Sequence, residues 1–283
     1  MSDPPFSACR TARFALDSPK NSAEFLLMSE HSLIKRPEVR GKRVSFFVTC
    51  IVDMIYPHSG MAAVEVLERV GCRVDFPMAQ TCCGQLGFNG GYRAEARQVA
   101  RQFLRAFADS ELIVTPSGSC AAMVRHYYPE LFADDPVLRA EAERLAAITW
   151  ELTEFLVDGL GITDLGVTLA QPRTVAMHDS CHGLRGLGIQ RQPRALLAKI
   201  GNLTVVEMQS ADQCCGFGGL FAVKMPQISG AMLDEKVQNI LACQVDAVVT
   251  CDASCLTHIN GGLSRRGSSV RVYHVAEVLA GRL

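Results

Sequence analysis

Cysteine is the residue type in this sequence most able to do chemistry, with twelve copies among 283 residues. Two adjacent pairs stand out, Cys82-Cys83 and Cys214-Cys215. Neighbouring cysteines rarely bridge each other, because their side chains diverge and a disulfide needs a specific geometry. In a reducing compartment, cysteines in this number favour metal or redox chemistry over a disulfide framework.

The cysteines form a pattern that occurs twice. Each adjacent pair is followed by a glycine, Gly84 or Gly216, and the two pairs are offset by 132 residues. A single cysteine precedes each pair, across 31 or 32 intervening residues, and another follows, across 36 or 39. Matching gaps on both sides of both pairs indicate an internal duplication. The repeated positions are Cys50, Cys82, Cys83 and Cys120 in the first half and Cys181, Cys214, Cys215 and Cys255 in the second.

Short apolar runs rich in β-branched residues precede the cysteines and predict strands. Helical patterns lie between these runs, and the alternation predicts an α/β fold made of two duplicated units with mainly parallel sheets. Pro77 weakens the second of the predicted strands. We expect strands at 43–49, 74–78, 112–115, 174–177, 203–208 and 247–250, and helices at 61–70, 92–108, 193–200 and 229–243.

Each cysteine group therefore follows the carboxyl end of a predicted strand, which is the edge of an α/β sheet where ligands bind. We expect the four thiols of each half to converge there. The alternative is that these are small loop residues that only fill space. The predicted organisation is a leader at 1–40, a first repeat unit at 41–134, a helical connector at 135–170 with a helix at 137–156, and a second repeat unit at 171–283.

Four converging thiolates are soft ligands, suited to iron–sulfur clusters, zinc or copper(I). Structural zinc is usually held by two closely spaced cysteine pairs, whereas these ligands are spread over about 70 residues in each half. That spread favours an iron–sulfur cluster bound through cysteine and leaves zinc as the alternative. Gly84 and Gly216 could let backbone N–H groups approach the sulfur atoms. His178 and His182 flank Cys181, and we expect them to hydrogen-bond cluster sulfur or relay protons rather than ligate iron.

Composition excludes several other classes of function. There are 28 Lys+Arg against 29 Asp+Glu, so no basic field for nucleic acid is expected. Hydrophobic residues make up 48% of the chain, which is ample for a large core. No apolar run approaches the about 18 residues that a membrane-spanning helix needs, and no secretory pattern opens the sequence. The sequence predicts a cytoplasmic protein.

Five segments resemble the CCG (cysteine-rich) domain family of iron–sulfur proteins. That family includes one of the subunits of heterodisulfide reductase, the iron–sulfur subunits of glycolate oxidase and anaerobic glycerol-3-phosphate dehydrogenase, and a lactate-utilization branch, which is the most similar. The resemblance covers about residues 43–283. The matching segments are TCCGQLGFNG at 81–90, PSGSC at 116–120, HDSCHGLR at 178–185, QCCGFGGLFAVKM at 213–225 and SCLTHINGGLSRRGSSVRVYHVAEVL at 254–279.

The resemblance implies an iron–sulfur electron-transfer subunit of a cytoplasmic complex that oxidises L-lactate to pyruvate. The implied partners are a ferredoxin-like iron–sulfur subunit and a further small subunit. Because the sequence has no flavin or nicotinamide fingerprint, we expect the isolated chain to be inactive on lactate. Alternatives are a subunit of a thiol- or heterodisulfide-type reductase, and the iron–sulfur subunit of another 2-hydroxy-acid oxidase such as glycolate oxidase.

The resemblance also implies the cofactor, a 4Fe–4S cluster of cubane or noncubane type, one or two per chain. The family motif ends in C-x-x-C and supplies five cysteines to a noncubane cluster in the heterodisulfide reductase relative. Here the position three before Cys120 is Ser117, and the position three before Cys255 is Asp252, with Cys251 one residue away. Cys251 and Asp252 are therefore candidate additional ligands, and we expect the second half to hold the functionally dominant centre.

Overall fold

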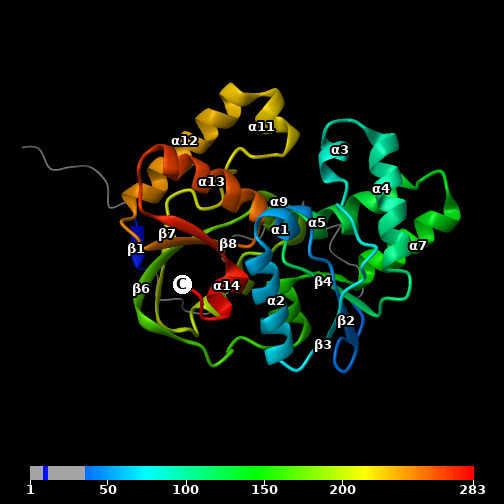
Figure 1. Ribbon diagram of the computed structural model, residues 1–283, viewed down its shortest axis with the longest axis horizontal. Helices are drawn as coiled ribbons and strands as arrows, with labels where there is room; N and C mark the ends of the chain where they lie inside the picture. The colour runs from blue at the N-terminus through cyan, green and yellow to red at the C-terminus, as the bar shows by residue number, and fades with distance from the viewer. Residues whose placement is uncertain (1–8, 12–35) are drawn as a thin grey trace, which may run out of the picture.

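The computed structural model describes residues 9–11 and 36–283, and it contains two β-sheets (Figure 1). The first sheet has the order β3-β2-β4-β5 and is parallel throughout. The second has the order β1-β7-β6-β8-β9, in which β1 is antiparallel to β7 and the other pairs are parallel. The strands are β1 Cys9–Thr11, β2 Arg43–Phe46, β3 Arg73–Asp75, β4 Leu112–Thr115, β5 Thr149–Glu151, β6 Thr168–His178, β7 Gly201–Met208, β8 Ala247–Thr250 and β9 Arg271–His274.

The two halves share one topology. In each, the first strand is central, the second lies on one side of it, and the third and fourth follow on the other side, so that β2, β3, β4 and β5 correspond to β6, β7, β8 and β9. This confirms the predicted α/β fold in two similar units. The edge strand β1 is an addition to the second sheet from the predicted leader; the rest of that leader up to residue 35 is outside the described residues.

Helices cover both sheets, and local sequence explains where several begin. Pro57, Pro136 and Pro226 occupy the first position of α2, α7 and α12, where the missing N–H has no helical partner to lose. The helices of the first half are α1 Cys50–Ile55, α2 Pro57–Arg69, α3 Gln85–Asn89, α4 Arg93–Ala106, α5 Gly118–Ala122, α6 Tyr128–Leu131, α7 Pro136–Ile148 and α8 Leu152–Glu154, with π-helical turns at Met123–Tyr127 and Phe155–Gly159. Those of the second half are α9 Cys181–Leu187, α10 Arg191–Leu197, α11 Leu220–Lys224, α12 Pro226–Ala242, α13 Ala253–Arg265 and α14 Val275–Leu279.

The segment between the halves differs from its prediction as one long helix at 137–156. Helix α7 ends at Ile148, and the next three residues form β5, which pairs with β4. Thr149 is β-branched and Trp150 is aromatic, so both suit a pleated, buried surface. Pairing with the edge of β4 therefore overrides the helical periodicity. As a result, three residues within segment 135–170 complete the first sheet, and its last three residues already belong to β6.

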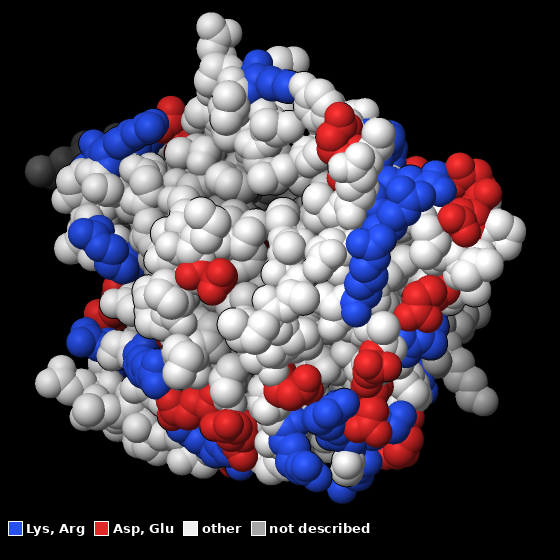
Figure 2. Space-filling view, turned by 45° about the vertical axis from the view of Figure 1, so that its right-hand side comes forward, with Lys and Arg blue, Asp and Glu red and all other residues white. Residues whose placement is uncertain are grey.

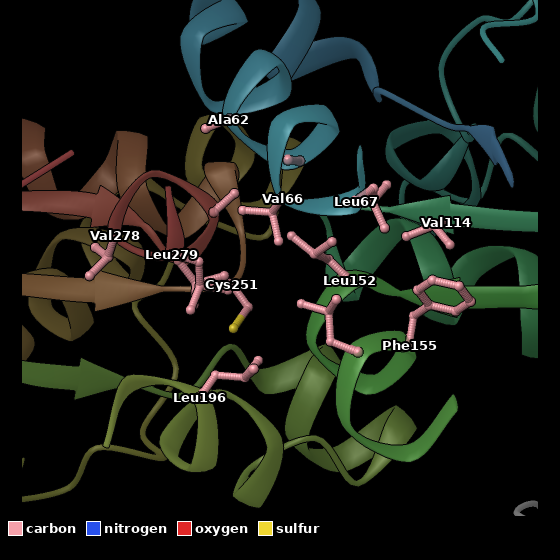
Figure 3. Packing of buried hydrophobic residues seen from close by; sticks show 14 of the residues in the cluster. Ala62, Val66, Leu67, Val114, Leu152, Phe155, Leu196, Cys251, Val278 and Leu279 are labelled. Carbon is pink, nitrogen blue, oxygen red and sulfur yellow. The ribbon is translucent and has the colours of Figure 1, made fainter. Parts of the chain in front are cut away.

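One hydrophobic core runs through both halves. It includes Val66 of α2, Phe155 after α8, and Val278 and Leu279 of α14. Figure 3 shows these side chains meeting, with Leu196 of α10 below them and the sulfur of Cys251 among them. Two further clusters lie under the outer helices of each half separately. The shared core fixes the two units relative to each other, so loops from both can form a single site.

Among the helices of residues 9–11 and 36–283, none has the length and apolar character needed to cross a membrane.

Candidate metal centre

All eight cysteines of the repeated pattern line one cavity of about 300 Å³. The cavity lies between the halves, with Leu86 of α3 and Phe221 of α11 among its lining residues. These two helices face each other across the upper part of Figure 1. The structure therefore brings the two predicted cysteine sets not to two separate edges but to one common space.

Four of these eight cysteines lie in the first turn of a helix. Cys50 and Cys181 are the first residues of α1 and α9. Cys120 and Cys255 are the third residues of α5 and α13, which follow the third strand of each sheet. The positive end of a helix dipole stabilises nearby negative charge and favours thiolate over thiol. Loops after equivalent strands thus present equivalent sulfur atoms to the cavity.

The glycine after each adjacent pair has a specific conformational role. Gly84 and Gly216 have φ values of 81° and 89°, a region that glycine enters without the steric cost of a Cβ. Their backbone N–H groups donate to the Sγ atoms of Cys82 and Cys214, both at 3.4 Å. This is the close approach of backbone to sulfur that the sequence predicted.

The first set of thiols forms a connected chain. The Sγ atoms of Cys50 and Cys82 lie 3.5 Å apart, and Cys83 interacts with both Cys82 and Cys120. Hydrogen bonds from the Cys50 and Cys83 thiols lower the pKa of Cys82 to about 3. Contact with Cys82 and then burial raise the pKa of the Cys50 thiol, and contacts with Cys120 and then Cys82, together with burial, raise that of Cys83. One thiolate per set is therefore available near neutral pH before any metal binds.

The second set repeats this chain. Hydrogen bonds from Cys181 and Cys215 lower the pKa of Cys214 to about 2. Contact with Cys214 and Cys255 and burial raise the pKa of the Cys215 thiol. The order of contacts along the four thiols is the same as in the first half, so the duplication extends to the chemistry of the site.

The two predicted histidines occupy different places. His182 lines the cavity, and its Nδ1 lies 3.6 Å from the Sγ of Cys181. His178 is fully buried, and neither of its ring nitrogens has a well-aligned hydrogen-bond partner among the described residues. One of its nitrogens and the sulfurs of Cys215 and Cys255 all lie within 4.8 Å of one another. Burial, and then the charge of Lys236, lower the pKa of His178 to about 3, so its ring is neutral.

Ser117 and Asp252, three residues before Cys120 and Cys255, act as helix caps. The Ser117 Oγ accepts a hydrogen bond from the backbone N–H of Cys120 at 3.3 Å. The Asp252 Oδ1 accepts from the N–H of Ser254 at 3.1 Å, and its Oδ2 accepts from the N–H of Ser119 at 2.9 Å. Both carboxylate oxygens are thus engaged, and one of them links the second half to the first.

Cys251 is the one candidate ligand that the structure does not bring to the shared cavity. Its side chain packs in the common hydrophobic core (Figure 3) and lines a different, small cavity together with Glu151 and Asp179. Burial raises the pKa of its thiol well above the usual range. These surroundings favour a packing role for this thiol.

Sequence reasoning missed one charged residue beside the second set. Lys236 of α12 is fully buried, and its Nζ donates to the carbonyl oxygen of Ser210 at 2.5 Å. Burial lowers the pKa of Lys236, while the nearby Cys215 and Cys255 act in the opposite direction. The signal was present in the sequence: Lys236 shares the apolar face of α12 with Leu233, Val237 and Ile240, at a spacing that places it inside.

Comparisons with known proteins agree with the geometry. The family model for the cysteine-rich CCG domain matches residues 44–125 and 175–260, which are the two structural repeats. The chain belongs to the CCG cysteine-rich domain family. It is 50% identical over 240 residues to lactate utilization protein A of Geobacillus kaustophilus, covering 85% of this chain and 99% of the relative. Its identity to lactate utilization protein A of Bacillus subtilis is 46% over 240 residues, covering 85% and 100%.

The fold also occurs in a solved structure. A hypothetical protein from Helicobacter pylori superposes with a TM-score of 0.57 at 11% sequence identity. The match covers 86% of this chain and 49% of the other, so this chain spans about half the length of that protein. At this identity the likeness concerns the fold alone.

Proposed function

We propose that this chain is an iron–sulfur electron-transfer subunit of a cytoplasmic complex that oxidises L-lactate to pyruvate. The observation that carries the proposal is the convergence of two four-cysteine sets on one cavity, in a chain about half identical to lactate utilization protein A. Cys50, Cys82, Cys83 and Cys120 would hold one centre, and Cys181, Cys214, Cys215 and Cys255 the other.

The residues present fit a 4Fe–4S cluster. Thiolate sulfur is the usual donor to such clusters, and the cavity of about 300 Å³ has room for groups much larger than a single ion. Each set has a thiol whose pKa is already low, Cys82 or Cys214. Binding therefore starts from a thiolate rather than from four neutral thiols.

A cluster held by these thiolates would accept and release single electrons. The protein's part is to hold the cluster and to set its potential. The N–H groups of Gly84 and Gly216 point at ligand sulfur, and hydrogen bonds to sulfur tune cluster potentials. Removing hydride from a 2-hydroxy acid needs a two-electron acceptor, which the chain's motifs do not include. We therefore assign lactate oxidation to the assembled complex.

Partner binding would take place near the cavity. Large apolar side chains are exposed on the helices that follow the cysteines: Met54 and Ile55 on α1, Leu86 on α3 and Val223 on α11. Figure 2 shows a face whose centre and top carry few charges, while charged side chains gather at its lower and right-hand edges. A ferredoxin-like iron–sulfur subunit docked beside these helices would bring its own cluster close to the cysteine sets. A further small subunit would complete the complex.

Metal analysis tests the cofactor. Protein purified anaerobically, or reconstituted with iron and sulfide, should contain both and show broad visible absorption. Zinc has a full d shell and gives a colourless protein. A preparation that holds stoichiometric zinc and takes up no iron or sulfide would refute the proposal.

Co-purification and genetics test the complex. The tagged chain should bring down iron–sulfur or dehydrogenase subunits from a cytoplasmic extract. Deleting its gene should abolish growth on L-lactate in a strain without another lactate dehydrogenase. Normal growth of that strain on L-lactate would point to a different 2-hydroxy acid, such as glycolate.

The shared cavity favours one alternative, a thiol- or heterodisulfide-type reductase subunit. Two sets of thiols facing the same space could act on a disulfide placed between them. Turnover of a small disulfide by the loaded chain, with a chemical reductant as the electron source and without partner subunits, would favour that function.

A further inference from the structure

The two cysteine sets have equivalent sulfur atoms but different surroundings. Phe47 stands three residues before Cys50, and His178 stands three residues before Cys181. Both are fully buried at the end of the central strand of their sheet. The first half therefore shows that an apolar ring fills this place adequately, and packing alone does not require an imidazole in the second half.

A second pair of equivalent positions shows the same change. Ala96 and Ser229 occupy equivalent positions. A Cβ added at Gly84 would contact the carbonyl oxygen of Ala96, and one added at Gly216 would contact that of Ser229. Seven residues further along each helix stand Phe103 and Lys236. In the first half Phe47 and Phe103 pack edge to face, with ring centroids 5.0 Å apart. In the second half an imidazole and an ammonium group replace both rings.

A buried imidazole without a well-aligned hydrogen bond needs an explanation, because an unsatisfied buried polar group is destabilising. A backbone hydrogen bond with Ala211 acts on the His178 ring, but it falls short of ordinary hydrogen-bond geometry, and neither nitrogen has a well-aligned partner among the described residues. One nitrogen lies with the sulfurs of Cys215 and Cys255, all within 4.8 Å of one another. A metal-bound histidine commonly directs its other N–H at a backbone carbonyl.

The position three residues before Cys255 holds no thiol, although it lines the cavity. Asp252 occupies it, and both of its oxygens accept backbone N–H groups. Cys251, one residue away, packs in the core. Among the described residues, three side chains lie close enough together to hold a metal ion, His178 with Cys215 and Cys255.

We propose that His178 is a nitrogen ligand of the metal centre held by Cys181, Cys214, Cys215 and Cys255. The second centre then has a mixed thiolate and imidazole donor set, whereas the first is bound by thiolates alone. Lys236 supports this arrangement, because its buried ammonium group lies near Cys215 and Cys255 and can offset thiolate charge there. Replacing cysteine by histidine raises the potential of an iron–sulfur cluster. The second centre should therefore have a higher potential with His178 than with a fifth thiolate at that position.

This inference rests on the proposed function, and pulsed electron paramagnetic resonance can test it on the full chain. The protein is labelled with ¹⁵N-histidine and reconstituted with iron and sulfide. The wild type should show a nitrogen directly coupled to the cluster spin. The His178→Cys variant should keep its iron, lose that coupling and shift the potential of the second centre downwards. The His178→Phe variant copies the first half, and it should fold and also lose the coupling.

A matched control is His182→Gln, which removes the neighbouring histidine and should retain the strong nitrogen coupling. A loaded wild type with only the weak coupling of a hydrogen-bonded ring would overturn the inference and leave the proposed function intact. Strong coupling that persists in His178→Cys would overturn it as well. Failure of the wild type to take up any iron would defeat both proposals.

Discussion

At the scale of single residues, the structure explains why each cysteine pair is followed by glycine. A side chain at Gly216 would meet two obstacles, a backbone φ of 89° and the carbonyl oxygen of Ser229 at 2.7 Å from the new Cβ. The backbone cannot relax easily, because the Ser229 Oγ also donates to the carbonyl oxygen of Gly216 at 2.7 Å. The glycine therefore fixes the direction of the N–H that reaches Cys214.

Replacing Gly216 with alanine tests this role. The left-handed backbone and the close carbonyl should together cost about 1–3 kcal/mol of stability, and iron content should fall. Gly261 provides the control, because it lies inside α13 with nothing within 4 Å of an added Cβ. Gly261→Ala should gain up to about 1 kcal/mol from helix propensity. Equal unfolding free energies for the two reduced, metal-free variants in urea would contradict this account.

At the scale of elements, the strands that lead to cysteines were the predictable part. Strands β4 and β8 match their predicted residues, since short apolar runs bounded by turns leave little choice. Strand β5 was not predicted, because three residues carry too little pattern and pairing with β4 decides their conformation. The helix caps made by Ser117 and Asp252 likewise depend on the tertiary structure. The sequence alone does not show that helices begin at these two positions.

Strand β5 contains a fully buried carboxyl group whose pKa is raised. Glu151 ends β5 and is fully buried. Its Oε2 accepts from the N–H groups of Thr153 and Glu154 at 2.7 and 3.1 Å, while its Oε1 has no partner. Burial raises the pKa of Glu151 to about 7 from 4.5. The folded protein therefore holds this proton between pH 4.5 and 7, where the unfolded chain has lost it.

The resulting stability is fully present below pH 4.5 and is lost as pH rises through 7. The shift corresponds to about 3 kcal/mol. Glu151→Gln keeps an acceptor for the two N–H groups and removes the titration. Between pH 4.5 and 8, we expect the unfolding free energy of the variant to rise relative to that of the wild type by up to about 3 kcal/mol. Urea unfolding of metal-free protein measures this difference. The exposed Glu143 offers a control, and Glu143→Gln should show no such trend. If the unfolding free energies of Glu151→Gln and the wild type changed with pH in parallel, Glu151 could not be the source of this pH dependence.

At the scale of the whole molecule, duplication has produced one body rather than two independent domains. A common core joins α2, α10 and α14, and Asp252 and His274 bond across the halves, to the Ser119 N–H and to the Pro116 carbonyl oxygen at 2.8 Å. The sequence revealed the repeat and its cysteines. It could not reveal that both sets face one cavity, because that depends on how the two sheets pack against each other. Nor could it reveal that His178 and Lys236 are buried beside only one of the sets.

This asymmetry predicts unequal roles for the two proposed centres. Cys83 and Cys215 are equivalent, equally buried members of the two sets, each 2% exposed, so their serine variants differ mainly in which centre is lost. A neutral hydroxyl is a weak ligand for iron, and each variant should lose iron at its own centre. Cys72→Ser is the control, because this half-buried thiol packs against the core, away from the cavity lining, and its iron content should match the wild type.

The measurement is iron content together with electron transfer in the assembled complex. Cluster potential follows ligand identity, hydrogen bonds and local charge, and the second centre has the buried Lys236 and His178 beside it, where the first has Phe103 and Phe47. Cys215→Ser should therefore abolish electron transfer, while Cys83→Ser should retain a measurable part of it. If Cys215→Ser lost its iron and kept activity while Cys83→Ser became inactive, the first centre would be dominant, and the buried charge beside the second would need a different role.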